Sequence, residues 1–342
     1  MSSTTPLIPT PPSPKEAWQQ ELIHAVTDPR ELCRLLDLNP DLFPETVTAL
    51  ARFPLKVPRG FIARMQKGNP ADPLLRQILP LSLEDQETAG YSRDPLGEAA
   101  TNPLPGLLHK YHGRVLLTLT GACAVNCRYC FRRHFPYTDN NPSQQSDKIL
   151  AYIQADPSIR EVLLSGGDPL LLNDRSLQHF TDQLARIEHV KRLRIHSRMP
   201  IVLPERITEG LLAWLSRLQQ MPILVTHCNH PQELSPAVLK AMQRLKAANV
   251  LLLNQAVLLK GVNDDVPTLI ALSEALFSAG IQPYYLHLFD KVQGAAHFDV
   301  DFQRAKMLYK ELSLHLPGYL LPKLAKEMAG EGAKQLVSNA GL

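Results

Sequence analysis

Short apolar runs recur through the later two thirds of the chain, and stretches with helical spacing of apolar residues separate them. Amphipathic helices are predicted to start at Ser235-Pro236, where a capping residue precedes a proline at the first helical position, and near Asp265, with an end at Gly280. Strands that alternate with helices indicate a parallel sheet with right-handed crossovers. The predicted strands are 115–120, 161–165, 192–197, 223–227, 250–258 and 283–289.

Six strand–helix units are too few for a closed eightfold barrel, so the pattern predicts an α/β fold, a partial (β/α)6 barrel, over residues 106–334. In such folds ligands bind at the carboxyl ends of the strands. Residues 15–105 are predicted to form an α-rich N-terminal region that prolines break into short pieces. Residues 1–14 are predicted to be a disordered tail, and 335–342 a C-terminal tail.

Composition excludes several classes of protein. The 342 residues are 44% apolar, enough for a sizeable core, and their net charge of +3 predicts no broad nucleic-acid or membrane-surface role. No apolar run approaches the roughly 20 residues that span a bilayer. The N-terminus lacks the pattern of a signal peptide. A cytoplasmic protein is therefore expected.

Three of the five cysteines, Cys123, Cys127 and Cys130, directly follow the first predicted strand with the spacing Cys-x3-Cys-x2-Cys. Three thiolates on one short loop can hold three corners of a cubane iron–sulfur cluster, which leaves one iron open to a small molecule. Two alternatives remain open at this point. His134 could complete a structural zinc site, or the thiols could be a chance cluster.

The cysteine spacing, with Tyr129 just before the third cysteine, resembles the radical S-adenosylmethionine (SAM) superfamily. The resemblance implies that the methionine part of SAM binds the open iron of a [4Fe-4S] cluster. It also implies reductive cleavage of the sulfonium to a 5′-deoxyadenosyl radical. The superfamily's usual fold is a partial barrel like the one predicted above.

A second signature, Ser165-Gly166-Gly167-Asp168-Pro169, ends the second predicted strand, and we call it the Gly-Gly-Asp signature. Glycines there allow close approach of the backbone to a ligand, and exposed backbone groups can hold the methionine amino end of SAM. Polar residues also end two later strands, where they suit the mouth of a cofactor site. The predicted cofactor-binding residues at these strand ends are Ser165, Gly166, Gly167, Asp168, His227 and Gln255.

Most of the chain beyond the N-terminal region resembles the lysine 2,3-aminomutases, and its short length resembles the branch that works with elongation factor P. That branch supplies β-lysine, which a ligase attaches to the factor. The resemblance rests on five groups of residues besides the cysteines and the Gly-Gly-Asp. These are Asp94-Pro95-Leu96-Gly97-Glu98, residues 105–111, Cys130-Phe131-Arg132-Arg133, His227 to Pro231 and residues 254–263.

The resemblance implies pyridoxal phosphate (PLP) as a further cofactor, with Lys334 as the lysine that binds it covalently. The family's glycine-rich loop before that lysine is reduced here to 329–333, which keeps two of four glycines. Lys110 and Arg114 match the residues that bind the cofactor phosphate. Without this resemblance, Lys334, Lys110 and Arg114 would be interpreted as ordinary solvated charged residues.

Substrate-binding residues also follow from the resemblance. Arg132 matches the arginine that binds the substrate carboxylate. Asp290 and Glu327 match the two acids that bind the ε-ammonium group, although the second family residue is an aspartate. Paired acids favour a cationic substrate, here L-lysine, and disfavour a glutamate-like one.

The sequence thus predicts an isomerase that converts L-lysine to β-lysine by radical 1,2-amino migration. The alternatives are another radical SAM enzyme, such as a methyltransferase or a different aminomutase, and a non-enzymatic iron–sulfur redox sensor. No cysteine follows Cys228, so the zinc site that many family members carry in a C-terminal tail is not expected. The sequence does not decide whether the protein is a homo-oligomer.

Overall fold

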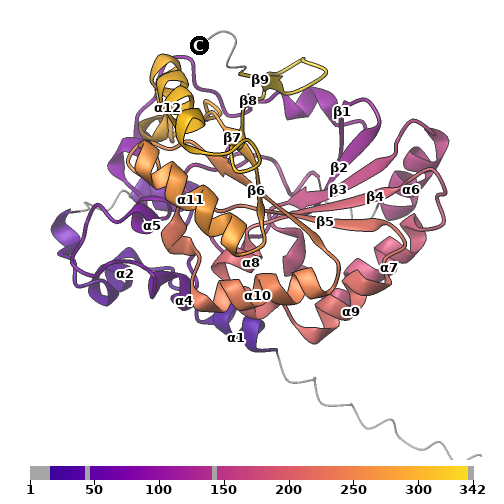
Figure 1. Cartoon of the computed structure of the whole chain (residues 1–342), viewed down its shortest axis with the longest axis horizontal. Coiled ribbons are helices and arrows are strands. Elements are labelled where there is room, and N and C mark those ends of the chain that lie inside the picture. Colours follow the sequence, from indigo (N-terminus) through magenta and orange to yellow (C-terminus); the bar gives the residue numbers. More distant parts are fainter. Residues whose placement is uncertain (1–15, 43–46, 141–144, 338–342) are drawn as a thin grey trace, which may run out of the picture.

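A computed structural model describes residues 16–42, 47–140 and 145–337 (Figure 1). The tail predicted at 1–14 lies outside the described residues. The chain forms one nine-stranded sheet whose strands follow one another in sequence order. Strands β2 to β8 are parallel, and β1 and β9 join the two ends antiparallel. The strands are β1 Leu107–Tyr111, β2 Arg114–Thr120, β3 Glu161–Gly166, β4 Arg192–Ser197, β5 Met221–Thr226, β6 Leu251–Val257, β7 Gln282–His287, β8 Lys323–Lys326 and β9 Gln335–Leu336.

The six predicted strands are confirmed as β2 to β7, and a helix follows each of them before the next strand begins. These crossover helices are α6 Ser146–Ala155, α7 Asp174–Leu184, α9 Glu209–Arg217, α10 Pro236–Ala247, α11 Val266–Ser278 and α12 Phe302–His315. The predicted caps are also present, because Ser235 accepts a hydrogen bond from Val238 N and Asp265 accepts one from Thr268 N. The partial (β/α)6 barrel is therefore confirmed.

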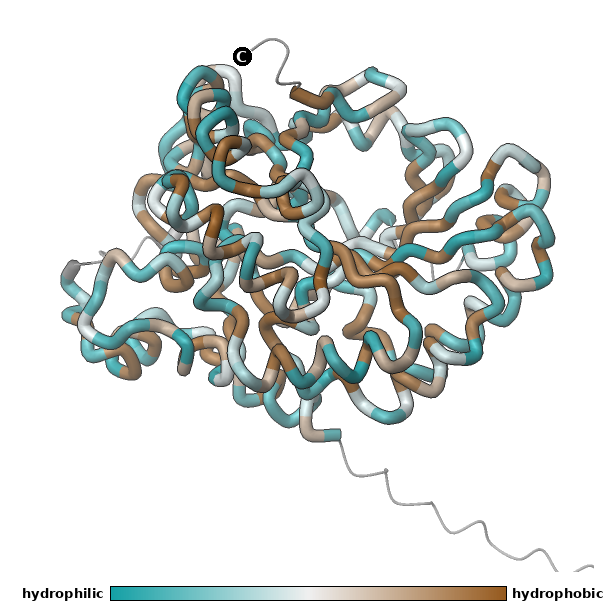
Figure 2. Tube along the Cα trace, in the orientation of Figure 1, coloured by the Kyte–Doolittle hydropathy of each residue, from teal (hydrophilic) through white to brown (hydrophobic). Residues whose placement is uncertain are grey.

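The strands separate an apolar outer face from a polar interior. In β4, Leu193 and Ile195 are buried, whereas the alternate residues Arg194 and His196 are only partly buried. The helices cover the outer face of the curved sheet (Figure 1), and brown apolar segments follow the strands through the middle of the molecule (Figure 2). The barrel interior is therefore available to polar chemistry.

The N-terminal region consists of short helices, as predicted, and prolines begin two of them. Pro29 and Pro73 are the first residues of α2 and α5, after the capping residues Asp28 and Asp72. The helices are α1 Ala17–Ile23, α2 Pro29–Leu35, α3 Val47–Arg52, α4 Arg59–Ile62 and α5 Pro73–Arg76, with 3₁₀ turns at Pro40–Leu42, Ser82–Asp85 and Glu98–Thr101. No helix in the described part of the chain is long and apolar enough to cross a membrane.

Two ends of the sheet that are far apart in strand order meet through side chains. Lys110 and Tyr111 of β1 contact Glu327, the residue after β8, at 3.1 Å and 2.7 Å. Figure 1 shows β1 and the β8–β9 hairpin at the same end of the molecule. We call this contact between Lys110, Tyr111 and Glu327 the seam.

Candidate active site

The cysteine loop follows β2 and is held by the N-terminal region. Backbone N–H groups of Asn126 and Arg128 donate to the carbonyls of Lys56 and Gln77 at 3.1 Å and 2.9 Å. The Arg128 side chain is fully buried and donates to Glu84 from Nε at 2.8 Å. These contacts fix the loop between the barrel and the N-terminal helices.

The three thiols of this loop influence one another. Burial and the nearby Cys127 together raise the pKa of the Cys130 thiol to about 11. Arg198 donates to Cys127 Sγ at 2.7 Å. Three adjacent thiols with a cation beside them are a donor set that suits an iron–sulfur cluster.

The zinc alternative receives no support. The ring nitrogen Nε2 of His134 lies 3.0 Å from the carbonyl oxygen of Gln293, so this side chain is engaged elsewhere. Among the described residues, no group of three or more His, Cys, Asp or Glu side chains is placed to hold a metal ion, so the arrangement of the thiols does not by itself distinguish zinc from a cluster.

Sequence reasoning missed Arg198, which follows directly after β4. Its guanidinium is buried and binds Glu233 at 2.9 Å and Gln77 at 2.7 Å, besides Cys127. Asp168 accepts hydrogen bonds from the Arg198 backbone N–H at 2.8 Å and from Ser197 Oγ at 2.7 Å. The position of Arg198 at the carboxyl end of a strand was a signal that could have identified it.

The Gly-Gly-Asp signature packs against the cysteine loop. A Cβ atom on Gly167 would lie 2.2 Å from the carbonyl oxygen of Ala122, and one on Gly166 would lie 2.5 Å from that of Thr120. The N–H of Asp168 donates to the same Ala122 oxygen at 2.8 Å. The close approach that requires glycine is therefore to the loop itself, and it places the signature beside the thiols.

Lys334 enters the other side of the barrel interior. Its Nζ atom lies 3.3 Å from Glu327 Oε2, 3.4 Å from His287 Nε2 and 5.1 Å from the centre of the Tyr285 ring. Burial lowers the pKa of Lys334, although Glu327 opposes this shift. An amine with a lowered pKa is what covalent attachment of an aldehyde cofactor requires.

The two predicted ammonium-binding acids lie close together but differ in charge state. Burial and the charge of Glu327 together raise the pKa of Asp290 to about 7. Burial would also raise the pKa of Glu327, but the ammonium groups of Lys334 and Lys110 lower it to about 2. The Glu327 carboxylate is therefore paired with cations and ionised. Asp290 has too little positive charge around it to stay fully ionised at neutral pH.

The predicted phosphate-binding residues lie on β1 and β2. Lys110 contacts Glu327, as described, and the Arg114 guanidinium carbon lies 4.6 Å from the centre of the Tyr111 ring. Tyr285, beneath Lys334, interacts with the positive charge of Arg114 as well. Both cations therefore lie near Lys334.

Arg132 lies between the two halves of the site. It donates from Nε and Nη2 to the two carboxylate oxygens of Glu98, and from Nη1 to Ser165 Oγ at 3.1 Å. Ser165 belongs to the Gly-Gly-Asp signature on the thiol side, and the charge of Glu98, the other partner of Arg132, acts on Asp290 on the Lys334 side.

His227 and Gln255 occupy the interior between these halves. Burial and Arg198 lower the pKa of His227 to about 3, so its ring is neutral at pH 7. Gln255 Nε2 lies 3.5 Å from the Nδ1 atom of His196. The Nε2 atoms of both histidines are buried without a partner among the described residues. Unpartnered buried polar atoms are sites where a polar ligand fits.

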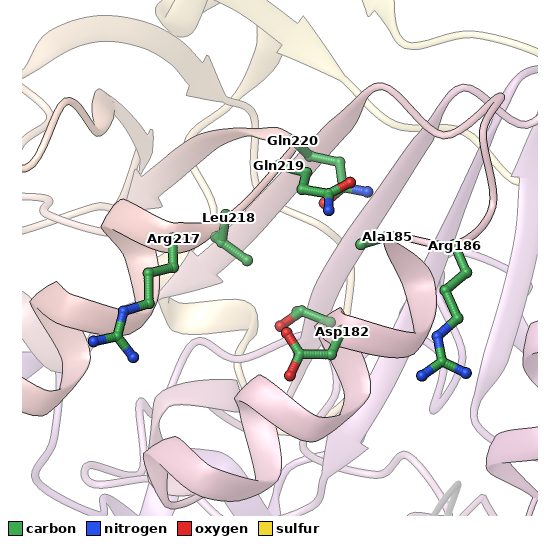
Figure 3. A pocket seen from close by; sticks show the side chains of 8 residues that line it. Asp182, Ala185, Arg186, Arg217, Leu218, Gln219 and Gln220 are labelled. Carbon is green, nitrogen blue, oxygen red and sulfur yellow. The ribbon is translucent and has the colours of Figure 1, made fainter.

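The predicted residues therefore form one interior site with a thiol side and a Lys334 side. A cavity of about 430 Å³ lies elsewhere, between α7 and α9 near the start of β5 (Figure 3). None of the predicted site residues lines it. It adjoins the amino end of β5, whereas the cysteine loop follows the carboxyl end of β2.

Comparison with known proteins identifies the class and then the family. Residues 117–272 match the radical SAM superfamily. L-lysine 2,3-aminomutase of Haemophilus influenzae is 48% identical over 323 residues, which cover 94% of this chain and 96% of that protein. The Escherichia coli protein of the same name is 50% identical over 322 residues and 94% of each chain. The chain is a radical SAM protein. It belongs to the lysine 2,3-aminomutase family.

The lengths of the relatives differ. The L-lysine 2,3-aminomutase of Clostridium subterminale is 35% identical over 320 residues, which cover 93% of this chain but 76% of that protein. Among solved structures, a radical SAM methyltransferase from Sphaerobacter thermophilus aligns with 64% of this chain and 68% of its own, with a TM-score of 0.44 and 17% identity.

Family membership implies three groups: a [4Fe-4S] cluster, SAM and PLP. The residues present fit each of them. The adjacent thiols suit the cluster, the unpartnered histidine nitrogens leave polar positions for SAM, and Lys334 is a largely buried amine whose lowered pKa suits covalent attachment of PLP.

Proposed function

We propose that this protein converts L-lysine to β-lysine by radical migration of the amino group from C2 to C3. The observation that carries the proposal is the cluster of Lys334, Asp290 and Glu327, with Arg132 held nearby by Glu98, whose charge also acts on Asp290. Such a site offers a reactive amine, two anions for a distant ammonium group and a guanidinium for a carboxylate. Those are the features that distinguish lysine from other amino acids.

The residues on the thiol side would hold the radical-generating groups. Cys123, Cys127 and Cys130 would bind the cluster, and Ser165 to Asp168, with His227 and Gln255, would line the SAM site. When bound, these groups supply a carbon radical that removes and returns a hydrogen atom, and PLP supplies a conjugated ring that spreads the unpaired electron. The protein's own task is to position the reactants and exclude water.

The residues on the Lys334 side would hold PLP and prepare the amine. Lys110 and Arg114 would donate to the phosphate. Lys334 must lose a proton before it reacts with the aldehyde, and burial favours that neutral form. His287, itself neutral because burial and Lys334 hold its pKa well below the usual value, would accept a hydrogen bond from the amine.

Substrate binding would exchange contacts of Glu327. Its carboxylate now binds Lys334, Lys110 and Tyr111. The ε-ammonium of lysine would replace Lys334 at this carboxylate and supply Asp290 with the positive charge that it lacks. Arg132 would bind the α-carboxylate at the opposite end of the substrate.

We also propose that the β-lysine is attached to elongation factor P by a separate ligase in the cytoplasm. This part rests on the resemblance to the short branch of the family. The near-complete mutual coverage with the Haemophilus and Escherichia proteins supports it, because the clostridial protein extends well beyond this chain. Ligation of the purified product to the factor in a reconstituted system would test it.

The decisive experiment is anaerobic incubation of the cluster-loaded protein with lysine, SAM, PLP and a reductant, followed by chiral analysis of the products. We expect β-lysine, and we expect none from Lys334→Ala, which should also lack the absorption of lysine-bound PLP. SAM cleavage without any β-amino acid would indicate a different radical SAM enzyme. A reducible cluster without SAM cleavage would indicate a redox sensor.

A further inference from the structure

The sequence motif from Asp94 to Glu98 has a structural consequence that none of the roles above uses. The Asp94 carboxylate accepts hydrogen bonds from the backbone N–H groups of Glu98 at 2.9 Å and Ala99 at 3.1 Å. Gly97 takes a left-handed backbone conformation with φ of +64°. The motif therefore fixes the start of the 3₁₀ turn Glu98–Thr101 and with it the Glu98 side chain.

Glu98 points at Arg132 and binds it with two hydrogen bonds. The distances are 2.8 Å from Nε to Oε2 and 2.6 Å from Nη2 to Oε1. Both residues are buried, with 8% of each exposed. A paired contact of this kind fixes the plane of the guanidinium as well as its distance.

The contact occupies one side of the guanidinium. A guanidinium carries five N–H groups, and within the described part of the chain three of them are used: Nε and Nη2 toward Glu98, and Nη1 toward Ser165. One N–H on each Nη atom therefore stays available to a ligand. Two such groups suffice to bind a carboxylate.

We propose that Glu98 is a positioning residue that orients Arg132 for the substrate α-carboxylate. This inference rests on the proposed function and deepens it, because it adds a residue that never touches the substrate. The opposite role is also defined by the geometry. If lysine needed the Nε and Nη2 side, Glu98 would compete with its carboxylate, and removal of the Glu98 charge would strengthen lysine binding.

The test measures equilibrium binding of two ligands to the cofactor-loaded, unreduced protein by calorimetry, so that no radical reaction occurs. The ligands are L-lysine and L-lysinamide, in which a neutral amide replaces the carboxylate. We expect Glu98→Gln to weaken lysine binding by about ten- to a hundredfold, the usual effect of losing a charged hydrogen bond. Lysinamide binding should change by less than about threefold, because it offers no carboxylate to Arg132.

The controls separate orientation from folding. Glu87→Gln, an exposed acid of the same segment, should leave both affinities unchanged. Glu98→Asp retains the charge on a shorter side chain and should recover part of the preference for lysine. If Glu98→Gln does not fold, the preference of Glu98→Asp for lysine over lysinamide decides the test. A preference equal to or larger than that of the wild type overturns the inference.

The outcomes distinguish this inference from the proposed function. Tighter lysine binding by Glu98→Gln, or an equal loss of lysine and lysinamide binding, would overturn the positioning role. A wild-type protein that makes no β-lysine and does not prefer lysine to lysinamide would instead overturn the proposed function. A wild-type protein that makes β-lysine, with a Glu98→Gln variant that keeps the full preference, refutes the inference alone.

Discussion

At the scale of single residues, the charge state of Asp290 determines how the site responds to pH. Burial and Glu327 raise its pKa to about 7, so the group is protonated in acid and ionised above neutrality. An ammonium ligand binds the ionised form. Lysine affinity should therefore weaken as the pH falls through about 7, by up to about tenfold per pH unit.

Calorimetric lysine titrations of the unreduced, cofactor-loaded protein between pH 6 and 8.5 test this expectation. Asp290→Asn is the matched variant, because it keeps the shape and removes the titration. We expect it to lose most of the pH dependence and to bind lysine more weakly than the wild type above neutrality. A variant with the wild-type slope would show that another group titrates.

The residue scale also shows the limit of sequence reasoning. Resemblance to the family identified Arg132 and Lys334 as candidate site residues, and the structure places both in the barrel. Arg198 could not be predicted as a partner of Cys127, because 71 residues separate them and no local pattern connects them. Glu98 belongs to a recognisable sequence motif, but its contact with Arg132 forms only in the folded chain, 34 residues apart in sequence.

At the scale of elements, the Gly-Gly-Asp signature and the cysteine loop behave as one unit. Gly167→Ala would place a methyl group 2.2 Å from the Ala122 carbonyl oxygen, so the loop must move. We expect a loss of about 1–3 kcal/mol in the free energy of unfolding and a lower iron content after reconstitution. Chemical denaturation and iron analysis provide the measurements.

Gly60→Ala is the control for this substitution. A Cβ atom there has no neighbour within 4 Å, and the residue lies in α4, where alanine is the better helix former. It should be neutral or slightly stabilising and retain full iron content. Equal behaviour of the two variants would contradict the close packing of signature and loop.

A second element, the turn Ser82–Asp85, connects the N-terminal region to the cysteine loop through Glu84. Glu84 binds both Arg128 and Arg133, and all three side chains are buried. Glu84→Gln leaves two guanidiniums without their anion and should cost about 3–5 kcal/mol in the free energy of unfolding. Denaturation curves and iron content would report the effect.

Glu31→Gln is the matched control in the same region, because Glu31 pairs with Arg59 at the surface. Exposed ion pairs contribute little, so this variant should lose less than about 1 kcal/mol. If both variants lost the same stability, the buried triad would not be the stronger attachment of the N-terminal region.

Elements differ in how well the sequence predicts them. Strands β2 to β7 carry apolar runs, because helices cover their outer faces, and these runs predicted all six. β8 has two buried residues, Leu324 and Ala325, between exposed lysines, and β9 has only two residues. Strands so short at the end of a sheet leave no periodic pattern to detect.

At the scale of the whole molecule, the contact between the two ends of the sheet at the seam depends on pH. The pKa of Glu327 is lowered to about 2 from its ordinary value of 4.5, so the ionised form stabilises the fold. That contribution is complete above the unfolded-state pKa and is lost as the pH falls toward 2. Acid should therefore loosen β8 and β9 before the central strands.

Hydrogen exchange of the cofactor-free protein between pH 5 and 3, corrected for intrinsic rates, tests this expectation. Protection of Lys326 and Gln335, which pair β8 with β9, should fall more steeply than that of β5. Glu327→Gln should remove the difference, since it cannot ionise. Parallel loss of protection in β5 and β9 would contradict a local role of the seam.

The seam also affects how the flat ring of PLP can reach the barrel interior. When backbone hydrogen bonds join the two edge strands of a barrel, a ligand can enter only through the open ends of the barrel. Here Lys110 and Tyr111 meet Glu327 through part-buried side-chain contacts, which open by rotation of side chains rather than by separation of a backbone ladder. We therefore expect the ring to enter sideways between these two ends of the sheet, at a rate set by how often the contact between Lys110 and Glu327 opens.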